Sequence, residues 1–314
     1  MKKPRKFKKS RREETGAHAA PVFVSADEEP RPTSAMAVRL AKALTKEFGN
    51  GTVLPLVGEG AYVSVRWFIP FSIESLESAV GAVGVPVGHL TEISGPEGSG
   101  KTSLVLRLIE RTQAIGGTAV LVDNEHSFDP ERASRDYGVN LQDLIVTQPD
   151  TVEDALAYID KIAEEAKGRD EIVGVFWDSI GGGLTKAELE GDYDQSHYAA
   201  AAKVLTPGLK KLAIKIDESN IALVAINQVR DNIGAGPFAP KTRTPGGRAL
   251  KHTAFLRLEL SKRETIKKGQ FALGIVVNVR VMKNKIAPPF RNAKFSLYFD
   301  GRTIQSLAGD EGAE

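Results

Sequence analysis

Residues 95–103 (GPEGSGKTS) constrain the fold of this chain more than any other stretch. They have the spacing G-x-x-x-x-G-K-[ST], with a strand-like apolar run at 89–93 before them and a helix-like run from Ser103 after them. Glycines at this spacing let backbone N–H groups curve around an anion, and a helix N-terminus adds partial positive charge. A glycine-rich turn that merely precedes a lysine is the alternative, but the strand–loop–helix context favours a phosphate-binding loop.

The loop predicts a nucleoside triphosphate bound with Mg²⁺. Lys101 is placed to reach the β- and γ-phosphates, and the Thr102 hydroxyl is placed to ligate the metal. The residues of the loop expected to contact the nucleotide are Gly95, Pro96, Glu97, Gly98, Ser99, Gly100, Lys101, Thr102 and Ser103.

Composition excludes several classes of protein. The 314 residues suffice for one large α/β domain with appendages, and no apolar run approaches the ~18 residues of a membrane span. The absence of cysteine excludes disulfides, thiolate zinc sites and cysteine nucleophiles. Together with the lack of a secretory signal pattern, this predicts a cytoplasmic protein with no membrane role.

The net charge of +2 hides a basic N-terminus. Residues 1–12 hold eight lysines and arginines and no acid, which predicts an unfolded segment that contacts DNA or RNA phosphates; a solubilising tail is the alternative. Residues 13–34 lack periodicity and are expected to be disordered. Residues 35–48 then predict an amphipathic helix, which packs either on its own core or on a neighbouring subunit.

Alternating strand and helix patterns predict an α/β fold. We expect a turn at 84–88, helices at 73–82, after the phosphate loop, after Asp129–Pro130, from a capping box at Asp150 to 167, and at 196–217 with a break at 206–207. The expected strands are 62–66, 89–93, 118–122, 144–146, 172–177, 221–226, 255–260, 273–282 and 295–299. This order predicts a mostly parallel central sheet flanked by helices, with antiparallel strands late in the chain.

Three polar residues follow apolar strands, where ligands of such sheets collect. Glu125 is a candidate to orient or deprotonate the attacking water, although a surface acid is the alternative. Asp178 fits an aspartate that supports magnesium, and Gln228 is placed to sense the γ-phosphate.

The segment 229–245 is too long for a passive connection. It and the residues after it carry Arg230, Lys241, Arg243, Arg248 and Lys251, with Phe238 among them, which suits nucleic-acid binding; a mobile solvated loop is the alternative. Lys283 and Lys285 are two residues apart and so point the same way, either as edge-strand charges or as a phosphate clamp.

Taken together, the motifs resemble those of the bacterial RecA recombinase family. The resemblance spans about residues 38–301, and the segments that carry it are GPEGSGKT, DNEHSFDP, FWDS, ELEGDYDQSH, INQVR, TPGGRALK and KNKIAPPF. It implies a RecA-type P-loop ATPase core that uses ATP and Mg²⁺, forms helical homo-oligomeric filaments on single-stranded DNA and exchanges strands with homologous double-stranded DNA.

The resemblance also implies roles for individual residues. Glu125 would be catalytic together with Lys101 and Gln228, while Lys283 and Lys285 would reach the ATP of the adjacent subunit. Asp178 and Thr102 would support the metal. The adenine would lie near Asp129, Arg132 and Phe299. The residues implied to bind DNA are His197, Tyr198, Thr206, Lys210, Arg230, Phe238, Lys241, Arg243, Gly246, Gly247 and Arg248.

Several positions depart from the family pattern. Arg132 stands where a tyrosine is common, and His252 where an interface phenylalanine is usual. Pro207 within the DNA-contacting helix is expected to reposition Lys210. The chain ends soon after the core, so we expect the C-terminal duplex-gathering domain to be lacking and the basic arm to substitute for it, as would suit a phage-encoded relative.

These inferences predict four regions: a basic arm (1–34), an oligomerisation helix and linker (35–61), an ATPase core (62–304) and a short acidic tail (305–314). The expected function is ATP-dependent homologous pairing and strand exchange in the cytoplasm, at the nucleoid or in a phage host, with single-strand binding and loader proteins as further partners. The alternative is a RecA-like mediator ATPase that binds DNA or a recombinase without strand exchange.

Overall fold

The computed structural model describes residues 35–49, 65–191, 200–231, 242–243, 247–299 and 305–306. The chain divides into two compact units, residues 1–63 and 64–314. In the first unit, α1 (Ala35–Phe48) confirms the predicted amphipathic helix, and none of its side chains is buried. Met36, Leu40, Leu44 and Phe48 recur every four residues and are exposed, so α1 has an apolar face that nothing covers within residues 35–49, the described part of its unit.

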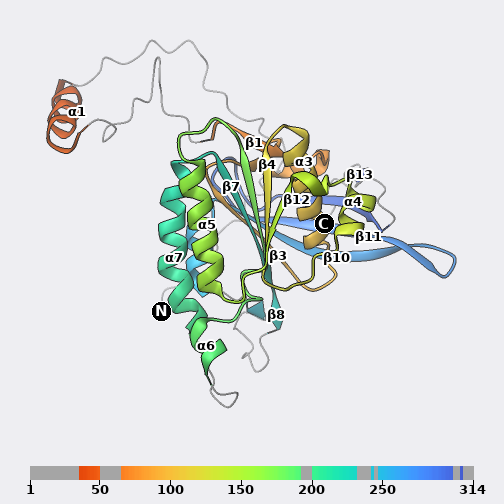
Figure 1. Cartoon of the computed structure of the whole chain (residues 1–314). Helices are drawn as coiled ribbons and strands as arrows, with labels where there is room; N and C mark the ends of the chain where they lie inside the picture. The colour runs from red at the N-terminus through yellow and green to blue at the C-terminus, as the bar shows by residue number, and fades with distance from the viewer. Residues whose placement is uncertain are drawn as a thin grey trace, which may run out of the picture. The chain divides into compact units, whose positions relative to one another are not determined.

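The second unit is built on a nine-stranded sheet among the described residues, in the order β13-β12-β11-β10-β3-β7-β6-β4-β5 (Figure 1). The strands are β3 (Leu90–Gly95), β4 (Thr118–Asp123), β5 (Leu144–Thr147), β6 (Val173–Asp178), β7 (Ile221–Gln228), β10 (Leu256–Lys268), β11 (Phe271–Asn284), β12 (Asn292–Tyr298) and β13 (Gln305–Ser306). From β10 to β5 every neighbouring pair is parallel, and from β10 to β13 every pair is antiparallel. The predicted α/β fold class is therefore confirmed.

Helices cover both faces of the sheet. One apolar core includes side chains of α2 (Glu74–Val80), α3 (Lys101–Ala114) and α4 (Pro130–Tyr137). The other includes side chains of α5 (Val152–Ala166), α7 (Ala200–Asp217) and α8 (Gly247–Thr253). The inner strands read as continuous apolar runs because both of their faces are buried. Short helices lie at Leu141–Asp143 and at α6 (Lys186–Glu190).

Two details of the helices differ from expectation. The cap of α5 is Thr151, whose Oγ1 accepts a 3.1 Å hydrogen bond from Asp154 N, so the predicted capping box at Asp150 is wrong by one residue. Thr151 has the extended backbone that a cap needs, and its bridge to Leu184 holds it there. The predicted break at 206–207 is also wrong, because α7 continues through Pro207.

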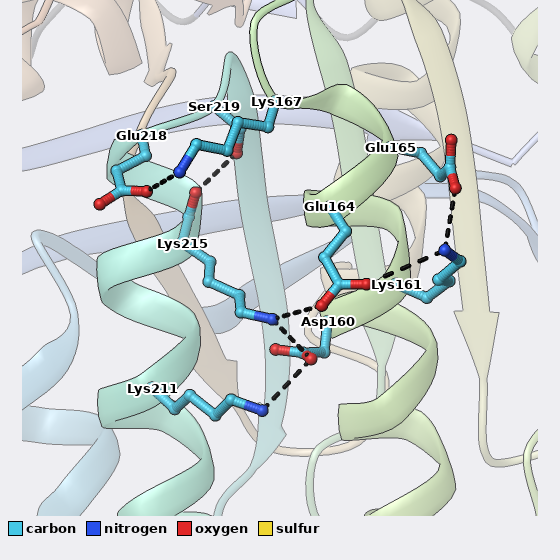
Figure 2. A network of polar contacts seen from close by, with 9 residues as sticks. All are labelled: Asp160, Lys161, Glu164, Glu165, Lys167, Lys211, Lys215, Glu218 and Ser219. Carbon is cyan, nitrogen blue, oxygen red and sulfur yellow. Dashed lines mark hydrogen bonds and ion pairs between the residues drawn. The ribbon is translucent and has the colours of Figure 1, made fainter.

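Packing against α5 explains why α7 survives its proline. A Cβ on Gly208 would lie 2.6 Å from Leu156 Cδ1, so the two helices approach closely at this glycine. Lys215 Nζ lies 2.7 Å from Asp160 Oδ2 and 2.9 Å from Glu164 Oε1 (Figure 2). Lys211 Nζ is 3.3 Å from the same Asp160 oxygen. These contacts fix α7 beside α5 in spite of the hydrogen bond that proline cannot donate.

The strand predictions were wrong where a glycine or a run of charged residues interrupts the apolar pattern expected of a strand. Residues 65–67 form no strand, and residues 62–64 lie outside the described part; the strand is β1 (Phe68–Pro70), which pairs with β2 (Gly84–Pro86) inside the predicted turn. A Cβ on Gly84 would lie 1.9 Å from Ile69 O, so only glycine permits this pairing. β10 extends to Lys268, well beyond its predicted end at 260, and β11 is two residues longer at each end than predicted. Together they form a projecting hairpin, in which the charged residues of β10 hide the alternation (Figure 1).

Candidate nucleotide site

The carboxyl ends of β3, β7, β6 and β4 lie at one edge of the sheet, and β3 leads directly into the predicted phosphate loop. Gly95 has φ +158°, and a Cβ there would lie 2.3 Å from Leu260 O. Gly98 and Gly100 have φ +68° and +92°, in the left-handed region that favours glycine. The glycines of the motif therefore meet local backbone requirements as well as leaving room for an anion.

Lys101 and Thr102 open α3 and point into this edge. Lys101 Nζ donates to Pro96 O at 2.7 Å, and Thr102 Oγ1 donates to Asp178 Oδ2 at 3.0 Å. Lys101 is 7% exposed, and burial lowers the pKa of its ammonium group, partly offset by the charges of Asp178, Glu125 and Glu97. The negative charge of a bound phosphate would stabilise the buried Lys101 ammonium group.

Glu125 lies between two hydrogen-bond donors. Gln228 Nε2 donates to Glu125 Oε1 at 2.7 Å, and the Ser179 hydroxyl donates to the same oxygen. A Cβ on Gly182 would lie 2.7 Å from Glu125 Cγ, so the backbone closes behind the carboxylate. The structure thus brings together the candidate base and the candidate sensor, which are 103 residues apart in sequence.

Asp178 is the most perturbed acid of the edge. It is 6% exposed, and burial, followed by the charge of Glu125, raises the pKa of its carboxyl group to about 6. The hydrogen bond from Thr102 acts in the opposite direction. A hydroxyl and a carboxylate oxygen suit Mg²⁺, which keeps several waters and substrate oxygens. Among the described residues no cluster of three or more His, Cys, Asp or Glu could hold a metal by itself.

The three residues expected near a base also lie at this edge. Asp129 caps α4 as predicted, accepting from Arg132 N at 3.0 Å. The Arg132 guanidinium carbon lies 6.0 Å from the centre of the Tyr137 ring. Phe299 is 46% exposed directly after β12, whose direction is that of β3 because two antiparallel pairings separate β12 from β10. A Cβ on Gly100 would lie 3.2 Å from Leu297 of the same strand.

Lys283 and Lys285 lie at the opposite, amino edge of the sheet. Asn284 of β11 is in register with Leu256, which is in register with Thr91, so four residues of β3, or about 13 Å, separate them from the phosphate loop. Lys283 Nζ donates to Lys251 O at 3.0 Å and to His252 O at 2.8 Å. Lys285 Nζ lies 5.6 Å from the centre of the Phe255 ring. Neither lysine faces the loop of its own chain.

The predicted DNA-binding residues are only partly described. Thr206 lies on α7 and donates to Ala202 O at 2.6 Å, and Lys210 is exposed on the same helix. Lys203 was missed by the sequence reasoning, although its i, i+7 spacing to Lys210 puts the two exposed lysines on one helix face.

The remaining candidates are located by backbone alone or not at all. Arg230 and Arg243 are paired across β8 (Arg230–Asp231) and β9 (Thr242–Arg243), so part of the long segment is a ladder rather than a structureless loop. Gly247 and Arg248 begin α8. The candidates outside the described residues are His197, Tyr198, Phe238, Lys241 and Gly246.

A buried polar group on β3 was also missed. Glu92 is fully buried, its Oε1 accepts from Asn227 Nδ2 at 2.8 Å, and its Oε2 accepts from Arg257 Nε. The available signal was a lone acid in the apolar run of residues 89–93.

No helix in the described ranges is long and apolar enough to cross a membrane. A family model described as the RecA N-terminal domain matches residues 35–304. The chain is similar to a protein named RecA from Thermus aquaticus, 43% identical over 267 residues, which are 85% of this chain and 76% of that relative. It is also similar to RecA of Allochromatium vinosum, 42% identical over 83% of this chain and 74% of the relative. A third similar protein is RecA of Symbiobacterium thermophilum, which is 39% identical over 90% of this chain and 79% of that relative.

Proposed function

This chain belongs to the RecA family, and we propose that it is an ATP-dependent homologous recombinase that forms helical filaments on single-stranded DNA and exchanges strands with a homologous duplex. The observation that carries the proposal is the 2.7 Å hydrogen bond from Gln228 to Glu125. It joins the candidate catalytic carboxylate to the residue from which the candidate DNA-binding segment begins. A change in the bound nucleotide that breaks this hydrogen bond would then also affect the DNA-binding segment.

At the carboxyl edge, the loop amides and Lys101 would hold the triphosphate, and Thr102 with Asp178 would hold Mg²⁺. The metal would neutralise charge on the phosphate oxygens. Glu125 accepts the proton of the attacking water, or orients that water, after giving up a hydrogen bond from Ser179 or Gln228. Gln228, released from Glu125, is free to donate to a γ-phosphate oxygen. Asp129, Arg132 and Phe299 surround the base.

The filament is supported by two incomplete surfaces. The apolar face of α1 is uncovered within residues 35–49, the described part of its unit. The edge strand β5 exposes Ile145 and Val146, and Ile145 lines a cavity of about 390 Å³ between β5 and α5. We propose that α1 of one subunit packs on the core of the next, with residues 35–61 as the oligomerisation segment. Lys283 and Lys285 then complete the neighbour's nucleotide site, since they cannot reach their own.

The DNA path is proposed along α7, the segment 229–245 and the start of α8. Lys203, Thr206 and Lys210 contribute one helix face to it. The basic arm, residues 1–34, recruits duplex DNA, and residues 62–304 act as the ATPase core with 305–314 as a tail. Single-strand binding and loader proteins are further partners at the nucleoid, in the cytoplasm.

The deciding experiment is strand exchange between circular single-stranded DNA and homologous linear duplex with ATP and Mg²⁺. We expect exchanged product from the wild-type chain and none from Lys101→Ala. Lys167→Ala, which removes an exposed ion pair with Glu218, is the matched control and should exchange normally. Filaments without product from the wild-type chain would instead identify a mediator.

A further inference from the structure

Four side chains form a row across one face of the sheet, called here the cross-sheet row: Lys283 on β11, Arg257 on β10, Glu92 on β3 and Asn227 on β7. Arg257 is in register with both Lys283 and Glu92, and Asn227 is in register with Ser94, two residues beyond Glu92 on the same face. Glu92 is the centre of the row, since it accepts from both Arg257 and Asn227.

The row touches both ends of the segment between β7 and β10. At one end, Asn227 directly precedes Gln228, whose side chain contacts Glu125. At the other end, Lys283 donates to the carbonyls of Lys251 and His252, in the last turn of α8. The two ends therefore connect through Glu92 although Asn227 and Lys251 are 24 positions apart in the sequence.

Stability alone does not account for a carboxylate at this place. The neighbours on this face include Leu90, Leu223 and Ala225, and a well-packed apolar residue is often as stabilising as a buried ion pair. Removing one partner of such a pair is costly, because the other charge is left buried. The contacts of Glu92 instead fix the directions of two side chains, Asn227 and Arg257, which lie near the two ends of the segment between β7 and β10.

We propose that Glu92 is a positioning residue that couples the nucleotide edge of the sheet to the segment 229–253, by orienting Asn227 beside Gln228 and by holding Arg257 beside Lys283. The inference rests on the proposed function, which assigns Gln228 and Lys283 their roles. Lys283 must leave the α8 carbonyls to reach a neighbouring subunit, and the same departure loosens the end of α8.

The charges of the row favour this balance. Burial lowers the pKa of Lys283, the nearby charges of Lys285 and Arg257 lower it further, and Glu92 acts in the opposite direction. Neutralising Glu92 leaves Arg257 and Lys283 as adjacent cations without their shared counter-charge. Lys283 is then expected to lose its place on the carbonyls of α8. In Glu92→Gln, Asn227 and Arg257 also compete for one acceptor oxygen where the carboxylate gave each its own.

The test measures coupling rather than activity. In wild type, a non-hydrolysable ATP analogue should tighten single-stranded DNA binding by a factor in the range of about 5 to 150. Glu92→Gln and the double variant Glu92→Gln/Arg257→Gln should reduce that factor to near one, while nucleotide affinity without DNA stays within about twofold of wild type. Hydrogen exchange at the amides of Ala254 and Phe255 should quicken in both variants.

The double variant separates positioning from folding, because it removes both buried charges and keeps two amides that can pair. Its thermal stability should recover relative to Glu92→Gln, and its coupling factor should not. Recovery of both would overturn the inference. The matched control, Lys167→Gln/Glu218→Gln, removes an ion pair between the ends of α5 and α7 and should keep wild-type coupling. If the wild-type chain shows no nucleotide-dependent DNA binding, the proposed function itself fails. If the wild-type chain shows it and the Glu92 variants keep the same coupling factor, this inference alone fails.

Discussion

The two edges of the parallel sheet differ in what their polar groups contact. At the carboxyl edge, side chains of one chain form two hydrogen-bonded pairs, Thr102 with Asp178 and Gln228 with Glu125. At the amino edge, about 13 Å of strand away, Lys283 binds backbone carbonyls and Lys285, just after β11, lies over an aromatic ring. In the proposed function, the fold therefore carries two halves of a nucleotide site at opposite edges of the sheet. Halves placed this way meet only in a head-to-tail contact, which generates a helical polymer unless it closes.

The strongest test of the carboxyl edge is Glu125→Gln. The amide keeps the size of the side chain but cannot accept a proton, so the ATP hydrolysis rate should fall by about 10² to 10⁴. Nucleotide binding should persist, because the loop and Lys101 are unchanged. Phosphate release with saturating single-stranded DNA and binding of a fluorescent nucleotide measure the two effects. A near-normal rate would remove Glu125 from the chemistry.

The split between edges is tested by mixing two inactive variants. Lys101→Ala and Lys285→Ala should each lower hydrolysis by about 10² to 10³. In an equal mixture, a functional site needs the loop of one variant beside the lysine of the other, so random head-to-tail assembly restores about one quarter of the sites. Recovered ATPase activity is the readout. No recovery at any mixing ratio would place both residues in the same subunit's site.

Asp178→Asn tests the electrostatic cost of the carboxyl edge. Because the pKa of Asp178 is raised to about 6 from an ordinary 3.8, the native state binds the proton more tightly than the unfolded state. The wild-type free energy of unfolding should therefore fall as pH rises through 6. Asn lacks this titration, so the variant should be more stable at pH 8 by about 1 to 3 kcal/mol, with the gap closing below pH 6. Urea unfolding in EDTA at pH 5 and 8 measures this. A gap that widens toward pH 5 would contradict it.

The smallest expected effect lies at the amino edge. Phe255 stacks on His89 with ring centres 3.8 Å apart and lies under the Lys285 ammonium. Phe255→Leu keeps apolar volume but loses both ring contacts, which should cost about 0.5 to 1.5 kcal/mol of unfolding free energy. Urea unfolding at neutral pH gives the value, with Phe271→Leu at the exposed hairpin tip as control. An equal loss of unfolding free energy in Phe271→Leu would show that the ring contacts of Phe255 add no stability beyond that of an exposed phenylalanine.

The sequence predicted the carboxyl edge better than the amino edge for a physical reason. Phosphate binding at Gly95 and Gly100 requires local backbone shapes that leave a readable motif, and Asp178 and Gln228 follow apolar strands of recognisable length. The strand order, the contact of Gln228 with Glu125 and the position of Lys283 depend on pairing between distant segments, which spacing does not encode.

Other failures came from tertiary contacts that override local propensity. The cap of α5 moved to Thr151 because a bridge to Leu184 fixes its backbone. Glu92 was overlooked because its partners, Asn227 and Arg257, come from strands far along the chain. α7 crosses Pro207 because charged contacts fix it to α5 after the proline and Leu205 packs in the shared apolar core before it.

That proline gives α7 two parts with different mechanical properties. From Lys211 onward the helix is fixed to α5 by charged contacts (Figure 2). Before Pro207, the turns that carry Lys203 and Thr206 are held by the packing of Leu205. The helical hydrogen bond to the carbonyl of Lys203 is missing, because Pro207 has no N–H to donate. A force on the turns before Pro207 would therefore be expected to bend the helix at residues 206–207 and leave the sheet undistorted. Along the proposed DNA path, a local change in α7 would therefore keep the geometry at Asp178 and Glu125.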